Sequence, residues 1–206
     1  MRQEHHDRSH GGDPAARVAA LEAVLAEHGV VSPESGEAQL AWAHDQVGPR
    51  NGARVVARAW IDRDYRARLL ADGTAAIAEL GYGGPEGAHI VAAENTPEVH
   101  NLIVCTLCSC YPWPLLGLPP DWYKSAPYRS RAVREPRALL REFGVELDES
   151  VTVCVWDSTA ETRYLVVPMR PDGTEKLDEP ALAALVTRDS MIGAGLPRSP
   201  RLAHAS

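Results

Sequence analysis

Apolar residues recur at helical spacing in the first part of the chain. Val18, Leu21 and Leu25 stand three or four positions apart, so they share one face of a helix. Asp13, which is followed by proline, is a favourable start for that helix, and Gly29 is a favourable end. The pattern therefore predicts an amphipathic helix between Asp13 and Gly29.

Further helical segments follow the first. Ser32 with a proline after it repeats the start signal, and the Gly-Pro pair at 48–49 is expected to end this second helix. Asn51 and Asp62 can cap later helices, and a short helix is predicted over Thr74–Leu80. The chain thus begins as helix after helix.

The first helices carry narrow apolar stripes, and few neighbouring residues in the sequence are available to cover these stripes. We therefore expect residues 1–80 to form an extended helical arm that buries its stripe on a partner, with residues 1–13 disordered. A helical bundle within the chain is the alternative that the pattern leaves open.

The pattern changes after the glycine-rich segment 81–87, which is typical of a flexible connection. Val151, Val153 and Val155 alternate with polar or mixed neighbours, as in a half-buried strand. Residues 81–206 are therefore expected to form an α+β domain with a small, mainly antiparallel sheet flanked by helices. The predicted strands cover His89–Ala93, Val99–Val104, Val151–Val155 and Arg163–Val167, and helices are expected over Pro136–Phe143 and Glu179–Thr187.

Composition narrows the class of protein. Hydrophobic residues make up 45% of the 206 residues, which excludes a wholly disordered chain. The net charge of −7 argues against a nucleic-acid partner. The uncharged run Val99–Pro120 contains four prolines and three cysteines, so no membrane span is expected. No secretion signal is evident at the start of the chain, and thiols without one are typical of a cytoplasmic protein.

Three of the four cysteines fall within the six residues Cys105-Thr106-Leu107-Cys108-Ser109-Cys110. Such a cluster indicates a metal site. Structural zinc is one interpretation, with Cys154 or His100 as the fourth ligand. An iron–sulfur cluster is another, although its cysteines usually stand farther apart.

The tripeptide Cys108-Ser109-Cys110 allows a third interpretation. If the amide nitrogens of Ser109 and Cys110 lose their protons, they can bind one ion together with the sulfurs of Cys108 and Cys110, all four donors in one plane. Cys105 can then reach one axial position, and the opposite position stays open. A low-spin trivalent iron or cobalt ion prefers such a plane, whereas zinc does not.

This motif resembles the metal-binding loop of nitrile hydratase α subunits. The resemblance covers Val104–Pro114, which reads VCTLCSCYPWP, and most of the chain from about Gly81 onward. It continues through 116–124, 128–131, 155–161 with 163–164, 170–175 and 186–193.

The resemblance implies an enzyme that adds water to a nitrile and releases the amide. It implies one low-spin, non-corrin Co(III) per chain, since Thr106 is typical of the cobalt members, while Fe(III) is less favoured. In this family Cys108 would be a sulfinate and Cys110 a sulfenate, and Cys105 would remain a thiolate. Ser109 would contribute its main-chain nitrogen.

The expected mechanism uses the open metal position for the nitrile nitrogen. Water, or the Cys110 sulfenate oxygen, then attacks the nitrile carbon. Cys108 and Cys110 are thus the expected catalytic residues, and Trp113 and Glu86 are candidates for the substrate pocket. The family often carries Gln where this chain has Glu86.

Oxidised cysteines need strong donors, preferably arginine. No arginine stands between Arg68 and Arg129. The resemblance implies that a separate β subunit supplies arginines, in an αβ unit that pairs to (αβ)2, with a metallochaperone as a further partner. The alternative is that folding brings distant arginines of this chain to the loop.

Two other functions stay open beside nitrile hydration. One is the related metal subunit of thiocyanate hydrolase, and the other is a zinc-stabilised structural module without catalysis. Cys154 is interpreted as an ordinary strand residue. Four further polar residues are interpreted as caps and turns: Asp157, Ser158, Asp189 and Ser190.

Overall fold

The computed structural model describes residues 13–30, 32, 48–83 and 88–200. The chain divides into two compact units, Met1–Asp45 and Gln46–Ser206. In the first unit, helix α1 (Pro14–Glu27) confirms the first predicted helix. Its apolar residues Val18, Leu21 and Val24 are exposed. The expected second helix, and the expected disorder up to Gly12, lie outside the described residues.

Three helices open the second unit: α3 (Pro49–Ile61), α4 (Arg63–Ala71) and α5 (Gly73–Glu79). Helix α3 begins at its proline, two residues before the expected start at Asn51. The carboxylates of Asp62 and Asp72 cap α4 and α5 by accepting from the backbone N–H three residues later.

The sequence pattern grouped α3, α4 and α5 with the arm. In the structure they belong to the unit that holds the strands, where α3 packs against α6 (Trp113–Leu116) and α10 (Glu179–Ala183). Helices α4 and α5 pack against β1 (His89–Glu94). Burial of Val55 and Val56 on α3 explains this packing.

Four strands form two separate two-stranded sheets. Strand β1 pairs with β4 (Thr162–Val167), and β2 (Val99–Val104) pairs with β3 (Thr152–Asp157). Both pairs are parallel, with His89 opposite Thr162 and Val99 opposite Thr152. The mixed α+β class is confirmed, but the expected antiparallel pairing is wrong.

The parallel pairing arises because each short turn passes the chain from one sheet to the other. Between β1 and β2, the Asn95 side chain accepts from the Asn101 backbone N–H at 2.8 Å, and Asn101 Nδ2 donates to the Glu94 carbonyl at 2.7 Å. These side chains replace the ladder bonds that a hairpin would make. Strands β1 and β2 therefore lie in different sheets, and so do β3 and β4.

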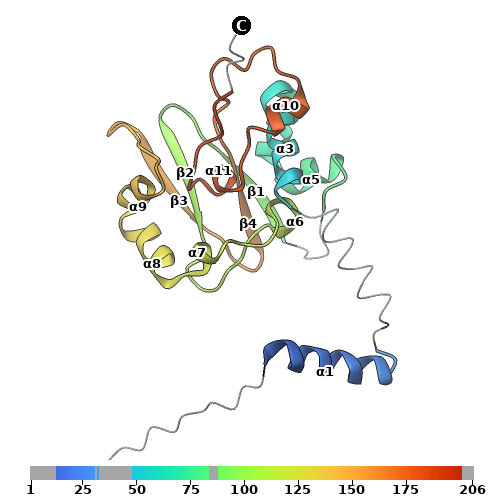
Figure 1. The fold of residues 1–206 in the computed structure, drawn as a ribbon. Helices are drawn as coiled ribbons and strands as arrows, with labels where there is room; N and C mark the ends of the chain where they lie inside the picture. The colour runs from blue at the N-terminus through green and yellow to red at the C-terminus, as the bar shows by residue number, and fades with distance from the viewer. Residues whose placement is uncertain (1–12, 31, 33–47, 84–87, 201–206) are drawn as a thin grey trace, which may run out of the picture. The chain divides into compact units, whose positions relative to one another are not determined.

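The two sheets form the centre of the unit and contact each other through β2 and β4 (Figure 1). Helices α8 (Ala126–Arg134) and α9 (Pro136–Glu142) pack on the β2–β3 sheet, and α11 (Arg188–Ile192) packs on β4. Leu102, Ile103, Leu165 and Val166 are buried within this core. The short helix α7 spans Asp121–Lys124. None of the helices in the described part of the chain has both the length and the apolar composition needed to cross a bilayer.

Candidate metal centre

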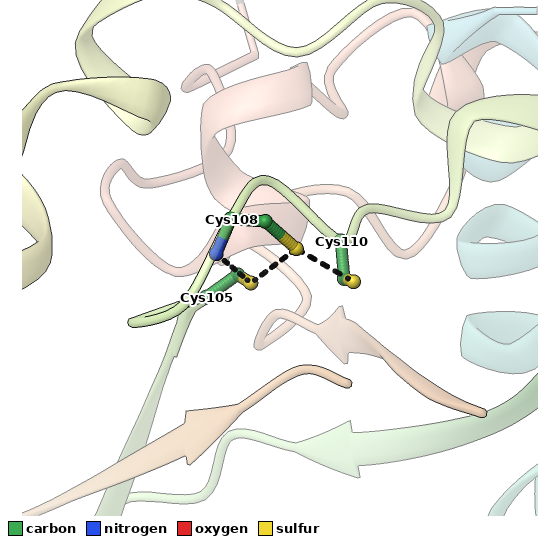
Figure 2. Close-up of side chains that lie close together, drawn as sticks. All are labelled: Cys105, Cys108 and Cys110. Atoms are coloured by element: carbon green, nitrogen blue, oxygen red, sulfur yellow. Dashed lines mark hydrogen bonds between the residues drawn. The ribbon is translucent and has the colours of Figure 1, made fainter. Parts of the chain in front are cut away.

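The cysteine loop begins where strand β2 leaves the core. Cys105, directly after the strand, is 1% exposed, whereas Leu107 two residues later is 88% exposed. The chain then returns, so Cys108 is exposed and Cys110 is half-buried. Figure 2 shows the three side chains converging on the inner side of the loop.

The three sulfurs lie close enough to share one ion. Cys108 Sγ is 3.6 Å from Cys105 Sγ and 3.3 Å from Cys110 Sγ, and all three sulfurs lie within 4.8 Å of one another (Figure 2). The Cys108 backbone N–H donates to Cys105 Sγ at 3.3 Å. Because metal–thiolate bonds are about 2.3 Å long, this donor set fits a single soft metal ion.

Hydrogen bonds distinguish Cys108 from Cys110. Bonds from the Cys110 thiol, the Ser109 backbone N–H and Cys105 lower the pKa of Cys108 to about 7. Burial and the neighbouring Cys108 raise the pKa of Cys110 to about 12. Of these two thiols, Cys108 is thus the one that more readily becomes a thiolate.

Asp157 binds Thr106 at the start of the cysteine loop. Its carboxylate accepts from the Thr106 backbone N–H at 2.9 Å and from the Thr106 hydroxyl at 2.5 Å. This contact agrees with the interpretation of Asp157 as a capping residue, and it places the cap on the cysteine loop. The parallel register sets Val104 opposite Asp157, and nothing in the local sequence signals that pairing.

Residues of α7 and α8 donate hydrogen bonds to backbone carbonyls of the cysteine loop. Arg129 Nη1 donates to the carbonyl oxygens of Leu107 at 3.2 Å and Cys108 at 3.4 Å. The Tyr123 hydroxyl donates to the Cys110 carbonyl at 3.0 Å. These contacts give the loop its shape without any bond to a sulfur.

A hollow of about 520 Å³ opens beside the cysteines. Trp113 lines it together with Cys108 and Cys110, whereas Glu86 lies outside the described residues. Arg163 of β4 also lines it and donates from Nη1 to the Tyr111 carbonyl at 2.8 Å. Folding therefore does bring two arginines of this chain, Arg129 and Arg163, close to the loop.

The zinc interpretation requires a fourth side-chain ligand. Cys154 lies on β3 opposite Asn101, and His100 is buried with its Nε2 2.7 Å from the Gly193 carbonyl. Within residues 13–30, 32, 48–83 and 88–200, the cysteine cluster contains Cys105, Cys108 and Cys110 but neither of these candidates. The described site thus supplies three thiols and main-chain nitrogen.

Comparisons with known proteins agree with the family resemblance of the cysteine motif. The family described as nitrile hydratase, alpha chain, matches residues 12–195. The chain is 53% identical over 186 residues to the α subunit of a low-molecular weight cobalt-containing nitrile hydratase from Rhodococcus rhodochrous, covering 90% of each chain. It is 39% identical to a thiocyanate hydrolase γ subunit from Thiobacillus thioparus, covering 87% of this chain and 78% of that one.

A solved structure shares the fold. The chain superposes on an Fe-type nitrile hydratase variant from Comamonas testosteroni Ni1 with a TM-score of 0.85 and 42% identity, over 95% of this chain and all of that one. From the sulfur geometry, the sequence match and the shared fold, we conclude that this chain belongs to the nitrile hydratase α-subunit family.

Proposed function

We propose that this chain is the metal-binding α subunit of a cobalt nitrile hydratase, which hydrates a nitrile to its amide. The observation that carries the proposal is the convergence of the Cys105, Cys108 and Cys110 sulfurs within 4.8 Å of one another, with the main-chain nitrogens of Ser109 and Cys110 in the same short loop. That arrangement suits an ion bound partly by the main chain. Membership of the family supplies the reaction class.

In this proposal Cys105, Cys108 and Cys110 hold the ion through sulfur, and Ser109 and Cys110 hold it through main-chain nitrogen. When bound, the trivalent ion supplies Lewis acidity toward the nitrile. Cobalt is supported by Thr106 and by the relative from Rhodococcus rhodochrous, which is named as cobalt-containing. Iron is the competing metal, as in the Fe-type structure.

We further propose that Cys108 becomes a sulfinate and Cys110 a sulfenate, with Cys105 left as thiolate. The lowered pKa of Cys108 supports its oxidation, because the thiolate is the reactive form. Dioxygen or a peroxide would supply the oxygen atoms, two for Cys108 and one for Cys110. The loop peptide would then gain about 48 Da.

The hollow beside the loop is the proposed nitrile site, with Trp113 as its apolar wall. The Cys110 oxygen faces this space in the proposal, and it either attacks the nitrile carbon or orients the attacking water. When water attacks, its oxygen bonds to the nitrile carbon, the carbon–nitrogen triple bond becomes a single bond in the amide, and both water protons end on nitrogen. When the Cys110 oxygen attacks instead, its S–O bond breaks and a water molecule restores the oxygen on sulfur, so the sum is again one water added to one nitrile. A role for Glu86 in binding the substrate also stays a prediction.

The proposed complex includes a β subunit. The expected role of its arginines is to donate to the oxidised cysteines, because Arg129 and Arg163 of this chain bind backbone carbonyls near the loop. The exposed Leu107 and Leu118 beside the site support a covering partner. Pairing to (αβ)2 and delivery of cobalt by a metallochaperone complete the proposal.

The decisive experiment is a metal and mass assay on the full chain produced with its partner subunit. We expect one cobalt per chain, a loop peptide heavier by about 48 Da, and amide formed from nitriles. The variants Cys108→Ser and Cys110→Ser should abolish turnover. One zinc per chain with unmodified thiols would overturn the proposal and favour the structural zinc module.

Thiocyanate hydrolysis is the second candidate, since the relative from Thiobacillus thioparus is named as a subunit of that enzyme. Its substrate carries a similar carbon–nitrogen triple bond, so the same metal centre serves both reactions. Product analysis separates them: thiocyanate turned into carbonyl sulfide and ammonia favours the hydrolase, and amide from nitriles favours the hydratase.

A further inference from the structure

Arg129 carries a charge that no carboxylate neutralises within the described part of the chain. It stands on α8, and its Nε is buried without a hydrogen-bond partner there. Its Nη1 is directed at the carbonyl oxygens of Leu107 and Cys108. The guanidinium therefore directs its charge at the backbone of the cysteine loop.

The Cys108 carbonyl belongs to the same peptide group as the Ser109 nitrogen. This peptide is trans, so its oxygen and its N–H point to opposite sides. Arg129 Nη1 donates to the oxygen at 3.4 Å, so the Ser109 N–H lies on the side of the peptide that faces away from Arg129. One peptide thus lies between the guanidinium and the sulfur cluster.

We propose that Arg129 is a positioning residue for the metal centre, which keeps the Ser109 nitrogen turned toward the sulfurs and offsets the negative charge of a backbone-ligated loop. This inference rests on the proposed function, because it requires the main-chain ligation stated there. Thiolates and deprotonated amides together carry more charge than a trivalent ion neutralises. Resonance spreads an amide nitrogen's charge to its carbonyl oxygen, which is where Arg129 donates.

This role differs from that expected of the β-subunit arginines. Those arginines would donate to oxygens on the cysteine sulfurs, on the side of the hollow. Arg129 acts on the opposite side of the peptide, where its Nη1 donates to the carbonyl oxygens of Leu107 and Cys108. Its effect should therefore be on how firmly the metal is held.

The test compares Arg129→Gln, Arg129→Lys and the control Arg134→Gln, each in the full chain produced with its partner subunit. Arg134 stands on the same helix but contacts Ser130 instead of the loop. The readouts are cobalt release to EDTA, the charge-transfer absorption of bound cobalt, and the unfolding midpoint of the metal-free protein. Neither of the first two depends on turnover.

Removing the charge should release cobalt about 10- to 100-fold faster and shift the absorption band. Arg129→Lys should restore most of both, and Arg134→Gln should match the wild type. The unfolding midpoint should change little, because a purely structural contact would lower it instead. Unchanged release and absorption in Arg129→Gln would overturn the proposal.

If Arg129→Gln yields no soluble protein, Arg129→Lys decides alone. Release and absorption close to those of the wild type support the proposal, and fast release with an unchanged midpoint contradicts it. A wild-type protein without the absorption of thiolate-bound trivalent cobalt would instead defeat the proposed function itself. The two failures are therefore distinguishable.

Discussion

At the scale of single residues, two polar side chains from distant parts of the sequence shape the cysteine loop. The Asp157 carboxylate accepts from both the backbone N–H and the hydroxyl of Thr106. Arg129 donates to the next two carbonyls that the loop offers, those of Leu107 and Cys108. Side chains outside the ligand set orient the ligands and are expected to affect metal affinity strongly. The metal site is thus larger than its three cysteines.

Replacing Asp157 by alanine tests this at the loop entry. The variant leaves the Thr106 N–H and hydroxyl without their acceptor, so we expect metal retention to fall about 10- to 100-fold. Cobalt release to a chelator measures the effect. Asp148→Ala is the control, because that exposed carboxylate binds Ser150 and not the loop. Equal release from both variants would show that the Asp157 contact is dispensable.

At the scale of secondary-structure elements, α11 reaches β2 at a glycine. Gly193 ends α11 with φ +87°, and a Cβ there would stand 1.9 Å from the Asn101 carbonyl oxygen. Gly144, after α9, has a similar φ of +79° but open space around it. Substitution of Gly144 therefore tests backbone strain alone, whereas substitution of Gly193 tests the same strain together with the close approach to β2.

Gly193→Ala should therefore destabilise the protein more than Gly144→Ala. The shared strain costs about 1–2 kcal/mol, and forcing a methyl group into the α11–β2 contact adds about 1–3 kcal/mol. Denaturant unfolding of the two metal-free variants measures the difference. If the two substitutions lower the free energy of unfolding equally, the close approach of α11 to β2 adds no cost, and the prediction is wrong.

At the scale of the whole molecule, a buried polar network joins the turn between the sheets to α11. His100 is buried between Gly193, whose carbonyl lies 2.7 Å from Nε2, and Asn95, whose amide lies 3.3 Å from Nδ1. Burial lowers the pKa of His100, although the bond to Gly193 opposes this. The folded protein thus keeps His100 neutral where the unfolded chain would protonate it.

This network predicts a loss of stability in acid. As pH falls below about 6.5, the unfolded chain takes up a proton at His100 before the folded state does, so the free energy of unfolding decreases. The contribution is at most about 1.4 kcal/mol per pH unit. His100→Gln should show a shallower pH dependence of the free energy of unfolding than the wild type. Parallel curves for wild type and His100→Gln would contradict the prediction.

The sequence alone determined the motif on which the proposed metal-binding chemistry rests, because the proposed ligands Cys105, Cys108, Ser109 and Cys110 are neighbours in the chain. The helices and strands were also largely predictable, since caps and apolar periodicity act over a few residues. Tertiary structure decided the parallel pairing of the strands and the approach of Asp157, Arg129 and Arg163 to the loop. These depend on contacts between residues far apart in the chain, which packing of the two sheets selects and local patterns do not encode.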